Sequence, residues 1–508
     1  MRALRNTSLS DLNWGDRACV LLLLFITTAI ASPAQTLTTI HTFGNVDGSV
    51  PETYVQATNG SLYGITLSGG NTVACSGGCG TIFKITASGK FTSLLSFDAS
   101  DGNGPYGSLV QASDGDLYGT AQAGGANLTP CFGDGCGTAF KITPTGTLTT
   151  LYNFCSRTDC TDGSLPLTNL IQAPNGDFYG TTATGGANCV SGSDGGCGTV
   201  FRITPSGGLT RLYSFCSQSG CADGAFPDAG LVQAPNGNLY GTTSFGGTSA
   251  ACTGGCGTVF EITPSGTLTT LHSFDGSDGS QPRWLIQASN GDFYGATLLG
   301  GTSTSCTGGC GTVFRITPSG TFTTLHSFDS TDGAKPVVGL QATDGNFYGT
   351  THLGGASTAC TGGCGTVFRM TPSGTLTTLH NFDNTDGSSP VGLLQDTNGQ
   401  LYGSTELGGT STACTGGCGT VFRLSVGLGP FVETQTTFGK VGAAVNILGT
   451  NLTGASSVAF NGIAAVFSVG SSGSSITTVV PTGATTGFVT VTTPSGTLTS
   501  NQKFSVTP

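Results

Sequence analysis

Short runs of Val, Ile, Leu, Phe, Tyr and Thr alternate with turn residues along most of the chain, and this pattern recurs seven times. In the sixth copy the apolar runs are Val337–Ala342, Phe347–Thr351, Gly365–Thr371 and Thr375–Phe382. No segment shows a 3.6-residue apolar period, so the pattern predicts four β-strands per copy. A recurring tyrosine marks the copies, which are 54 to 61 residues apart: Tyr63, Tyr118, Tyr179, Tyr240, Tyr294, Tyr348 and Tyr402.

Two tight turns recur in every copy. Ser-Gly or a near variant, such as Ser265-Gly266, separates the third and fourth runs. Asn-Gly or Asp-Gly separates the first and second runs, where we expect type I′ turns with positive φ at both central residues. These pairs are Asn59-Gly60, Asp114-Gly115, Asn175-Gly176, Asn236-Gly237, Asn290-Gly291, Asp344-Gly345 and Asn398-Gly399.

Seven units of four antiparallel strands predict an all-β fold, a seven-bladed β-propeller over residues 36–426. A linear β-solenoid is the alternative, although its coils are usually shorter. The last unit lacks its own fourth strand, and Thr36–Phe43 carries the fourth-strand pattern. We therefore expect this first strand to close the ring. Chain order places the short turns on one face of the disc and the longer loops, where we expect function, on the other.

Residues 1–34 have the pattern of a secretory signal peptide. Arg2, Arg5 and Arg17 precede the apolar run Ala18–Ala31, and small residues follow. An uncleaved anchor helix is the alternative, but the run is shorter than the roughly 20 residues that span a bilayer. We expect a secreted or cell-surface bacterial protein, monomeric and without a transmembrane segment after cleavage.

Charged residues make up 8% of the 508-residue chain, and the net charge is −11. Nucleic-acid binding depends on clustered Lys and Arg, so this composition argues against it. Removal of Cys19 with the leader leaves 18 cysteines in nine close pairs, which in an exported chain predict disulfides. A zinc site built by two blades is the alternative. The pairs are Cys75/Cys79, Cys131/Cys136, Cys155/Cys160, Cys189/Cys197, Cys216/Cys221, Cys252/Cys256, Cys306/Cys310, Cys360/Cys364 and Cys414/Cys418.

The loops that cross between units all carry Asp-Gly. A calcium loop would place oxygen ligands at alternating positions, and that spacing is absent. We therefore interpret these aspartates as turn residues and expect no cofactor, with calcium as the alternative. They are Asp47, Asp101, Asp162, Asp223, Asp278, Asp332 and Asp386.

A site for one ligand must break the symmetry of a repeat protein, so residues without a repeated counterpart are the binding candidates. His41, His272, His326 and His380 share one repeat position, which favours a packing role. The candidates are Arg283, Trp284, His352 and Glu406, beside two enlarged crossing loops at Cys155–Cys160 and Cys216–Cys221. Glu261 also breaks the repeat. No nucleophile elbow, zinc-protease motif or phosphate loop is present, so no catalytic residue is assigned.

After a short linker, residues 430–508 show about seven short strands, including Ala444–Leu448, Ser457–Phe460, Phe488–Thr492 and Lys503–Val506. This pattern predicts an immunoglobulin-like β-sandwich.

The blade motif, L-Y-G-T-T-x-x-G-G…G-T-V-F-x-I-T-P-S-G-T-L-T-T-L-H-x-F-D…D-G-x-x-P, resembles the Gloeo/Verruco tandem repeat of exported "choice-of-anchor" bacterial proteins. The resemblance covers about Thr36–Leu424 and implies no activity. The blade also looks like the NHL and streptogramin-lyase type of propeller, which supports the ring only. Val445–Asn451, Val458–Gly462 and Gly483–Val491 resemble an IPT/TIG domain, which implies a spacer or interaction module.

Together these observations favour a non-enzymatic propeller that binds an extracellular glycan or protein through its long-loop face. An extracellular polysaccharide lyase or glycoside hydrolase, with its site at the mouth of the central channel, is the first alternative. It would need non-repeated acids or histidines that face the channel. A purely structural envelope protein is the second alternative.

Overall fold

The computed structural model describes residues 35–508 except 71–72, 128–130, 132 and 189–196. The predicted signal peptide therefore lies outside the described residues. Within the described part, the regular structure is β-strand apart from short 3-10 turns such as Thr158–Cys160 and Ser219–Cys221. No helix there is long and apolar enough to cross a membrane.

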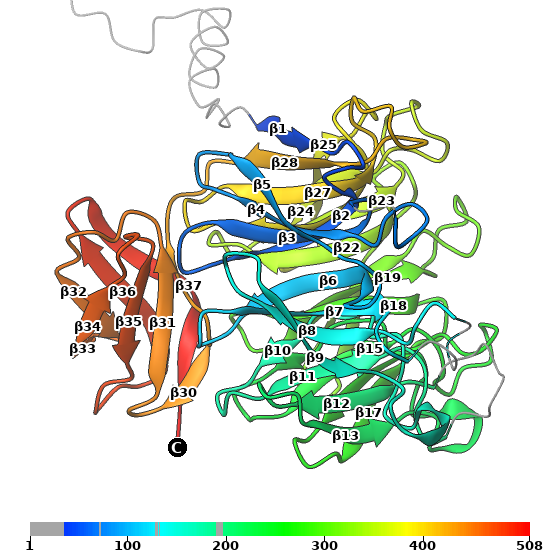
Figure 1. Ribbon diagram of the computed structural model, residues 1–508, viewed down its shortest axis with the longest axis horizontal. Helices are drawn as coiled ribbons and strands as arrows, with labels where there is room; N and C mark the ends of the chain where they lie inside the picture. The colour runs from blue at the N-terminus through cyan, green and yellow to red at the C-terminus, as the bar shows by residue number, and fades with distance from the viewer. Residues whose placement is uncertain (1–34, 71–72, 128–130, 132, 189–196) are drawn as a thin grey trace, which may run out of the picture.

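Seven four-stranded antiparallel sheets form the blades of a propeller, as predicted (Figure 1). Blades 1 to 3 comprise β2 (Ser49–Gln56), β3 (Leu62–Ser68), β4 (Thr81–Ile85) and β5 (Phe91–Ser96); β6 (Asn103–Gln111), β7 (Leu117–Ala123), β8 (Thr138–Ile142) and β9 (Leu148–Asn153); and β10 (Ile171–Gln172), β11 (Phe178–Thr182), β12 (Thr199–Ile203) and β13 (Leu209–Ser214). Blades 4 and 5 comprise β14 (Val232–Gln233), β15 (Leu239–Thr243), β16 (Thr258–Ile262) and β17 (Leu268–Ser273); and β18 (Ser280–Gln287), β19 (Phe293–Leu299), β20 (Thr312–Ile316) and β21 (Phe322–Ser327). Blades 6 and 7 comprise β22 (Ala334–Gln341), β23 (Phe347–Leu353), β24 (Thr366–Met370) and β25 (Leu376–Asn381); and β26 (Ser388–Gln395), β27 (Leu401–Leu407), β28 (Thr420–Ser425) and β1 (Thr36–Thr42).

The first strand closes the ring. β1 pairs antiparallel with β28, with Thr36 opposite Ser425, and completes blade 7. The prediction that the chain start supplies the missing fourth strand is confirmed. Ring closure gives β28 a partner on both of its edges, and β1 becomes the outer strand of blade 7.

Phenylalanine pairs hold neighbouring blades together. The Phe that follows the fourth strand of one blade meets the Phe of the third strand of the next, as Phe97 meets Phe140 with ring centroids 5.3 Å apart. Equivalent pairs occur at every boundary, including Phe43–Phe83 where the ring closes. Each third-strand ring also lies against the glycine of the Tyr-Gly pair, as Phe314 lies against Gly295, where a Cβ would come within 2.5 Å of it.

A second contact joins the blades at the long-loop face. The second cysteine of the disulfide loop in a blade accepts a backbone hydrogen bond from the residue that precedes a proline at the entry to the next blade, as Cys310 O accepts from Lys335 N at 2.9 Å. The glycine after that cysteine packs on this proline, and a Cβ on Gly311 would lie 2.6 Å from Pro336 Cδ. We call this the Cys-Gly/Pro clasp. Because the disulfide fixes the carbonyl, it supports blade-to-blade packing as well as loop shape.

The disulfides form as predicted wherever both partners are described. Eight pairs are bonded: Cys75–Cys79, Cys131–Cys136, Cys155–Cys160, Cys216–Cys221, Cys252–Cys256, Cys306–Cys310, Cys360–Cys364 and Cys414–Cys418.

The predicted disulfide of Cys197 is not confirmed. Cys197 is buried. Its predicted partner, Cys189, lies outside the described residues. Cys197 still occupies the clasp position of its blade, since its carbonyl accepts a hydrogen bond from Phe226 N at 3.1 Å. The backbone hydrogen bond of the clasp is therefore present in this blade as well. The ninth disulfide stays a prediction.

The Asn-Gly and Asp-Gly hairpins are not type I′ turns, which corrects the prediction. Only the glycine has positive φ, for example 75° at Gly60, while Asn59 does not. Gly60 N bonds to Ala57 O, and Asn59 Oδ1 accepts from Ser61 N at 3.0 Å. This geometry is a type I turn followed by a glycine bulge. The asparagine side chain stabilises the turn by its own hydrogen bond, so it does not need the left-handed region.

Residues Val432–Thr507 form one connected nine-stranded, barrel-like sheet instead of the seven or so strands expected. The long strand β37 joins its two halves, and Val432, Ile447, Phe460 and Phe504 are among its core residues. The strands are β29 (Val432–Thr434), β30 (Phe438–Lys440), β31 (Ala444–Gly449), β32 (Ser457–Phe460), β33 (Ile463–Ala465), β34 (Phe467–Val469), β35 (Ser475–Val479), β36 (Gly487–Thr493) and β37 (Gly496–Thr507).

This C-terminal unit lies beside the short-turn face of the propeller (Figure 1). Ser474 Oγ donates to Thr58 O of blade 1 at 2.8 Å, and Phe431 N donates to Thr397 O of blade 7 at 3.0 Å. The long-loop face is left clear of it.

Candidate functional site

Three of the four predicted binding residues meet at the long-loop end of the central channel. Arg283 lies on the innermost strand of blade 5, and His352 and Glu406 lie near the ends of the second strands of blades 6 and 7. The positive charge of Arg283 acts on the pKa of both other groups, so the three share one electrostatic environment. Trp284 points into the channel at a deeper level, described below.

Four further polar residues, which the sequence analysis did not select, belong to the same cluster. Three of them occupy one repeat position with Arg283, directly after the proline of the clasp: Glu52, Tyr106 and Asp228. The same position holds Leu167, Val337 and Val391 in the other blades, so the departure from the repeat was visible in the sequence. The fourth is Lys335, one residue before that proline in blade 6. We call the seven residues Glu52, Tyr106, Asp228, Arg283, Lys335, His352 and Glu406 the channel-mouth cluster.

A buried ion pair anchors the cluster. Arg283 Nη2 lies 2.6 Å from Asp228 Oδ2, and the Asp228 side chain is 1% exposed whereas that of Arg283 is 26% exposed. Ser244 Oγ donates to the other oxygen of Asp228 at 2.6 Å. Burial alone would lower the pKa of Arg283, but the charge of Asp228 and contact with Tyr106 raise it above its ordinary value. The guanidinium is therefore a fixed cation with one side toward the channel.

Two glutamates in the cluster have raised pKa values, so that near pH 7 Glu52 is largely protonated and Glu406 about half protonated. Glu52 is 4% exposed. Burial, helped by the charge of Glu406, raises the pKa of Glu52 to about 8 although Arg283 opposes the shift. Burial raises the pKa of Glu406 to about 7, against the lowering effects of Arg283 and Lys335. These carboxyl groups can donate hydrogen bonds at pH 7, which ionised carboxylates cannot do.

His352 is neutral in the same environment. Burial, together with the positive charges of Arg283 and Lys335, lowers the pKa of His352 to about 4. Burial also raises the pKa of Tyr106 to about 12, so its phenol keeps its proton. Both side chains can thus serve as neutral hydrogen-bonding groups at the channel mouth.

The backbone of the inner strands is strained at this mouth. The residue before the clasp proline has φ between 53° and 63° in all seven blades, including 56° at both Val50 and Lys335. Trp284 lies at a bulge in β18 and has a φ of 49°. The equivalent repeat position is Gly107 in blade 2 and Gly392 in blade 7. Such conformations are costly for bulky residues and occur often at functional sites. A bulge can also redirect a side chain, here that of Trp284.

Beneath the channel-mouth cluster, residues from all seven blades line a cavity of about 290 Å³ in the channel. Trp284 and Tyr54 supply aromatic surface to it, and Leu285, Val338 and Leu393 supply aliphatic surface. The channel therefore has a charged and polar mouth above a mostly apolar chamber.

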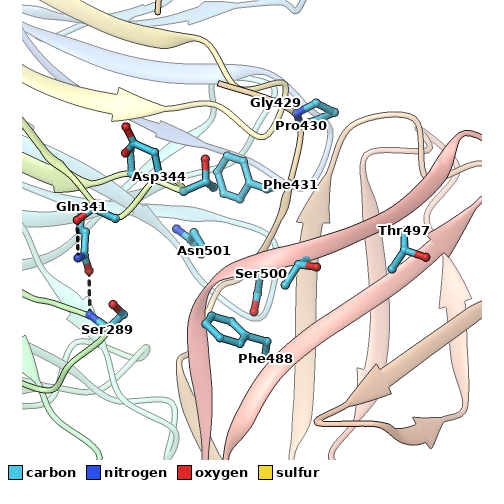
Figure 2. A pocket seen from close by; sticks show the side chains of 14 residues that line it. Ser289, Gln341, Asp344, Gly429, Pro430, Phe431, Phe488, Thr497, Ser500 and Asn501 are labelled. Carbon is cyan, nitrogen blue, oxygen red and sulfur yellow. Dashed lines mark hydrogen bonds between the residues drawn. The ribbon is translucent and has the colours of Figure 1, made fainter. Parts of the chain in front are cut away.

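A second hollow, of about 590 Å³, separates the C-terminal unit from blades 5 and 6 (Figure 2). Asp344 and Ser289 border it from the propeller, and Phe488 and Asn501 from the C-terminal unit. Phe488 is 40% exposed there. This crevice is polar and open, and it has no ionisable cluster comparable to the channel mouth among its described lining residues.

The repeated histidines and crossing-loop aspartates pair with each other. His326 Nε2 lies 2.7 Å from Asp332 Oδ2, and Asp332 Oδ1 accepts from Asp329 N at 3.0 Å. The same arrangement holds for His272 with Asp278 and His380 with Asp386. These are turn interactions, as the spacing indicated.

The enlarged crossing loops, a predicted binding patch, are braced internally. Asp162 is fully buried and accepts hydrogen bonds from Tyr152, Ser156 and Arg157, and Asp223 repeats this pattern in the next loop. Glu261 bonds to Tyr240 and Asn238 of its own blade. Their departures from the repeat thus have local structural reasons.

The Gloeobacter/Verrucomicrobia repeat model matches residues 27–191, 134–282 and 248–477, which together span most of the chain. The protein belongs to the Gloeobacter/Verrucomicrobia repeat family. No curated protein matches this member of the family.

Several solved structures are similar to this repeat-family protein. A fungal alcohol oxidase in complex with copper is 13% identical, with 93% of this chain and 99% of that chain covered and a TM-score of 0.50. A PQQ-bound aldose sugar dehydrogenase from Streptomyces coelicolor is 13% identical (78% and 99% covered, TM-score 0.41). A gluconolactonase from Xanthomonas campestris is 13% identical (78% and 92% covered, TM-score 0.36). At such identities the likeness concerns the fold alone.

Proposed function

We propose that this protein is an exported, monomeric propeller that binds an extracellular glycan at the long-loop mouth of its central channel. The observation that carries the proposal is the channel-mouth cluster. Six of the seven blades contribute side chains to it, at positions where the repeat is otherwise apolar or variable. A scaffold alone would not require buried charges, since each must be paired or neutralised at a cost in stability.

The remaining features fit a role outside the cell. Eight disulfides are the covalent pattern of proteins in oxidising compartments. In this proposal the C-terminal unit is an immunoglobulin-like, IPT/TIG-like spacer. It occupies the short-turn face, so the opposite mouth stays open to a ligand.

A matched pair of variants tests where a glycan binds. Trp284→Ala removes the aromatic side chain of the channel, and Phe488→Ala removes the exposed one of the interdomain crevice. Thermal-shift and calorimetric titrations would use soluble polysaccharide fragments, since a ligand of the folded state raises the melting temperature. We expect binding that Trp284→Ala weakens and Phe488→Ala leaves unchanged. Loss with Phe488→Ala alone would place the site in the crevice and overturn the proposal.

A hydrolytic or lyase activity is the second candidate, favoured by one observation. Glu52 and Glu406 have raised pKa values in one water-poor site, as general acids and bases of such enzymes do. Turnover of any bound fragment, followed by new reducing ends or by unsaturated product, would support catalysis. Binding without turnover over days would support the binding role and not the catalytic one.

A further inference from the structure

The channel mouth brings two of the protein's few cationic side chains together. The protein has 16 Lys and Arg against 27 Asp and Glu, yet Arg283 and Lys335 lie together at this one site. Both act on His352 and on Glu406. Lys335 has no ion pair with an acidic side chain within the described part of the chain.

The negative groups of the cluster do not offset these cations. Asp228 is sequestered by Arg283 and Ser244 and is almost inaccessible. At pH 7 Glu52 is largely protonated, Glu406 is about half protonated, and His352 carries no charge. A partial positive charge is therefore left over at the mouth, it increases as pH falls below 7, and it can attract an anion.

Arg283 also has an unused donor. Its buried Nε–H finds no hydrogen-bond partner among the residues that the structure describes. A guanidinium presents its N–H groups in a planar fork that matches a carboxylate. An anionic oxygen arriving at the mouth would meet the partly exposed side of this guanidinium, the Lys335 ammonium and protonated carboxyl donors.

The chamber beneath has the dimensions and surface for a sugar ring. Its volume of about 290 Å³ is close to that of about ten water molecules. Trp284 and Tyr54 offer aromatic surface for the apolar face of a pyranose. Charged groups thus lie above a cavity suited to the body of one sugar residue.

We propose, building on the glycan-binding function above, that the channel-mouth cluster recognises a carboxylate-bearing sugar, a uronic acid residue, through Arg283 and Lys335. Binding of the carboxylate is coupled to proton uptake. Glu52 interacts electrostatically with Glu406, Arg283, Tyr54 and Tyr106, and Glu406 in turn interacts with Lys335 and Arg283. An anion placed among these groups disfavours ionisation of both glutamates, so each must stay protonated for tight binding.

Isothermal titration of the mature chain with three disaccharides that differ only at their two C6 positions tests this proposal. The probes are digalacturonate, its dimethyl ester and α-1,4-galactobiose, followed by oligomers of alginate and of glucuronate-containing glycans. We expect at least one uronate to bind about tenfold or more tightly than its neutral counterpart. Its affinity should fall more than tenfold between pH 6 and pH 9, because both glutamates ionise over this range, and buffers of different ionisation enthalpy should report proton uptake.

Variants assign the binding to the cluster. Lys335→Met should weaken uronate binding about tenfold and leave neutral sugars unaffected, while the exposed Lys440→Met serves as the matched control. Arg283→Met should have a larger effect, but it leaves Asp228 buried and unpaired and so lowers stability, which makes Lys335→Met the decisive variant.

Two outcomes would overturn the proposal, and they separate it from the glycan-binding function. If neutral sugars bind as tightly as uronates and Trp284→Ala weakens both, the carboxylate preference is wrong while the glycan site stands. If no uronate or neutral saccharide binds at millimolar concentration, both proposals fail.

Discussion

Replacement of Glu52 by glutamine should change how the stability of the fold depends on pH. Glutamine keeps the shape of the side chain but cannot ionise. Glu52 has a pKa of about 8 in the folded protein against an ordinary value of 4.5. Because the folded-state pKa is raised, the folded protein retains a proton between these values that the unfolded chain has lost. The stabilising contribution of Glu52 is therefore complete below pH 4.5 and is lost as pH rises toward 8.

The magnitude follows from the interval between the two pKa values. At about 1.4 kcal/mol per pKa unit, the wild-type protein should lose at most about 5 kcal/mol through Glu52 between pH 4 and pH 9. The Glu52→Gln variant lacks this loss, so its unfolding free energy should exceed that of the wild type increasingly above pH 6. Urea unfolding at half-unit pH steps measures the difference, and Asp134→Asn, at an exposed loop position, is the matched control.

Parallel pH profiles for wild type and Glu52→Gln would refute this reasoning, because they would mean that Glu52 ionises alike in the folded and unfolded states. A variant that is less stable at every pH by the same amount would have the same meaning. Comparison of the two proteins cancels the titrating groups that do not interact with Glu52, whereas Glu406, whose charge acts on Glu52, contributes to the difference.

Three further perturbations probe other parts of the fold. His352 has its pKa lowered to about 4, so stability should be lost as pH falls from 6.5, by at most about 3 kcal/mol, and His352→Gln should remove this acid slope in the same urea series. Gly311→Ala would disrupt the clasp and should lower stability by about 3 kcal/mol in thermal unfolding, whereas Gly345→Ala, with open space around the added methyl, should cost only about 1 kcal/mol. Replacing both Cys306 and Cys310 by serine opens a small loop and should cost about 2 kcal/mol, measured by urea unfolding with protease nicking of that loop as a second readout.

The propeller was predictable because its information is local and repeated seven times. Turn pairs, strand patterns and clasp residues recur in register, so the blade count, the closure by β1 and the eight bonded cysteine pairs followed from spacing. The turn type did not, since Asn59 and its equivalents suit either a type I′ turn or the glycine-bulge turn that forms. The docking of the C-terminal unit depends on contacts such as Ser474 with Thr58, which no pattern in the linker specifies.

The candidate site was predictable only in part. Arg283, His352 and Glu406 break the repeat visibly, and the structure brings them together. Glu52 and Asp228 were missed because each resembles an ordinary surface acid in its own blade. Only alignment of the position after each clasp proline shows that these residues share one ring with Arg283. Their burial, and hence their shifted protonation, results from ring closure, which no single repeat encodes.

Closure by the first strand also sets the order of events during synthesis. Thr36 leaves the ribosome long before Ser425, its partner, so blade 7 can be completed only when nearly the whole propeller has emerged. Until then both β1 and the growing edge of the disc offer unpaired strands, which can capture other chains. A chain truncated before β28 would keep these edges permanently, and we expect it to accumulate as aggregate or be degraded. The pairing of β1 with β28, which completes the ring, therefore also distinguishes complete chains from truncated ones.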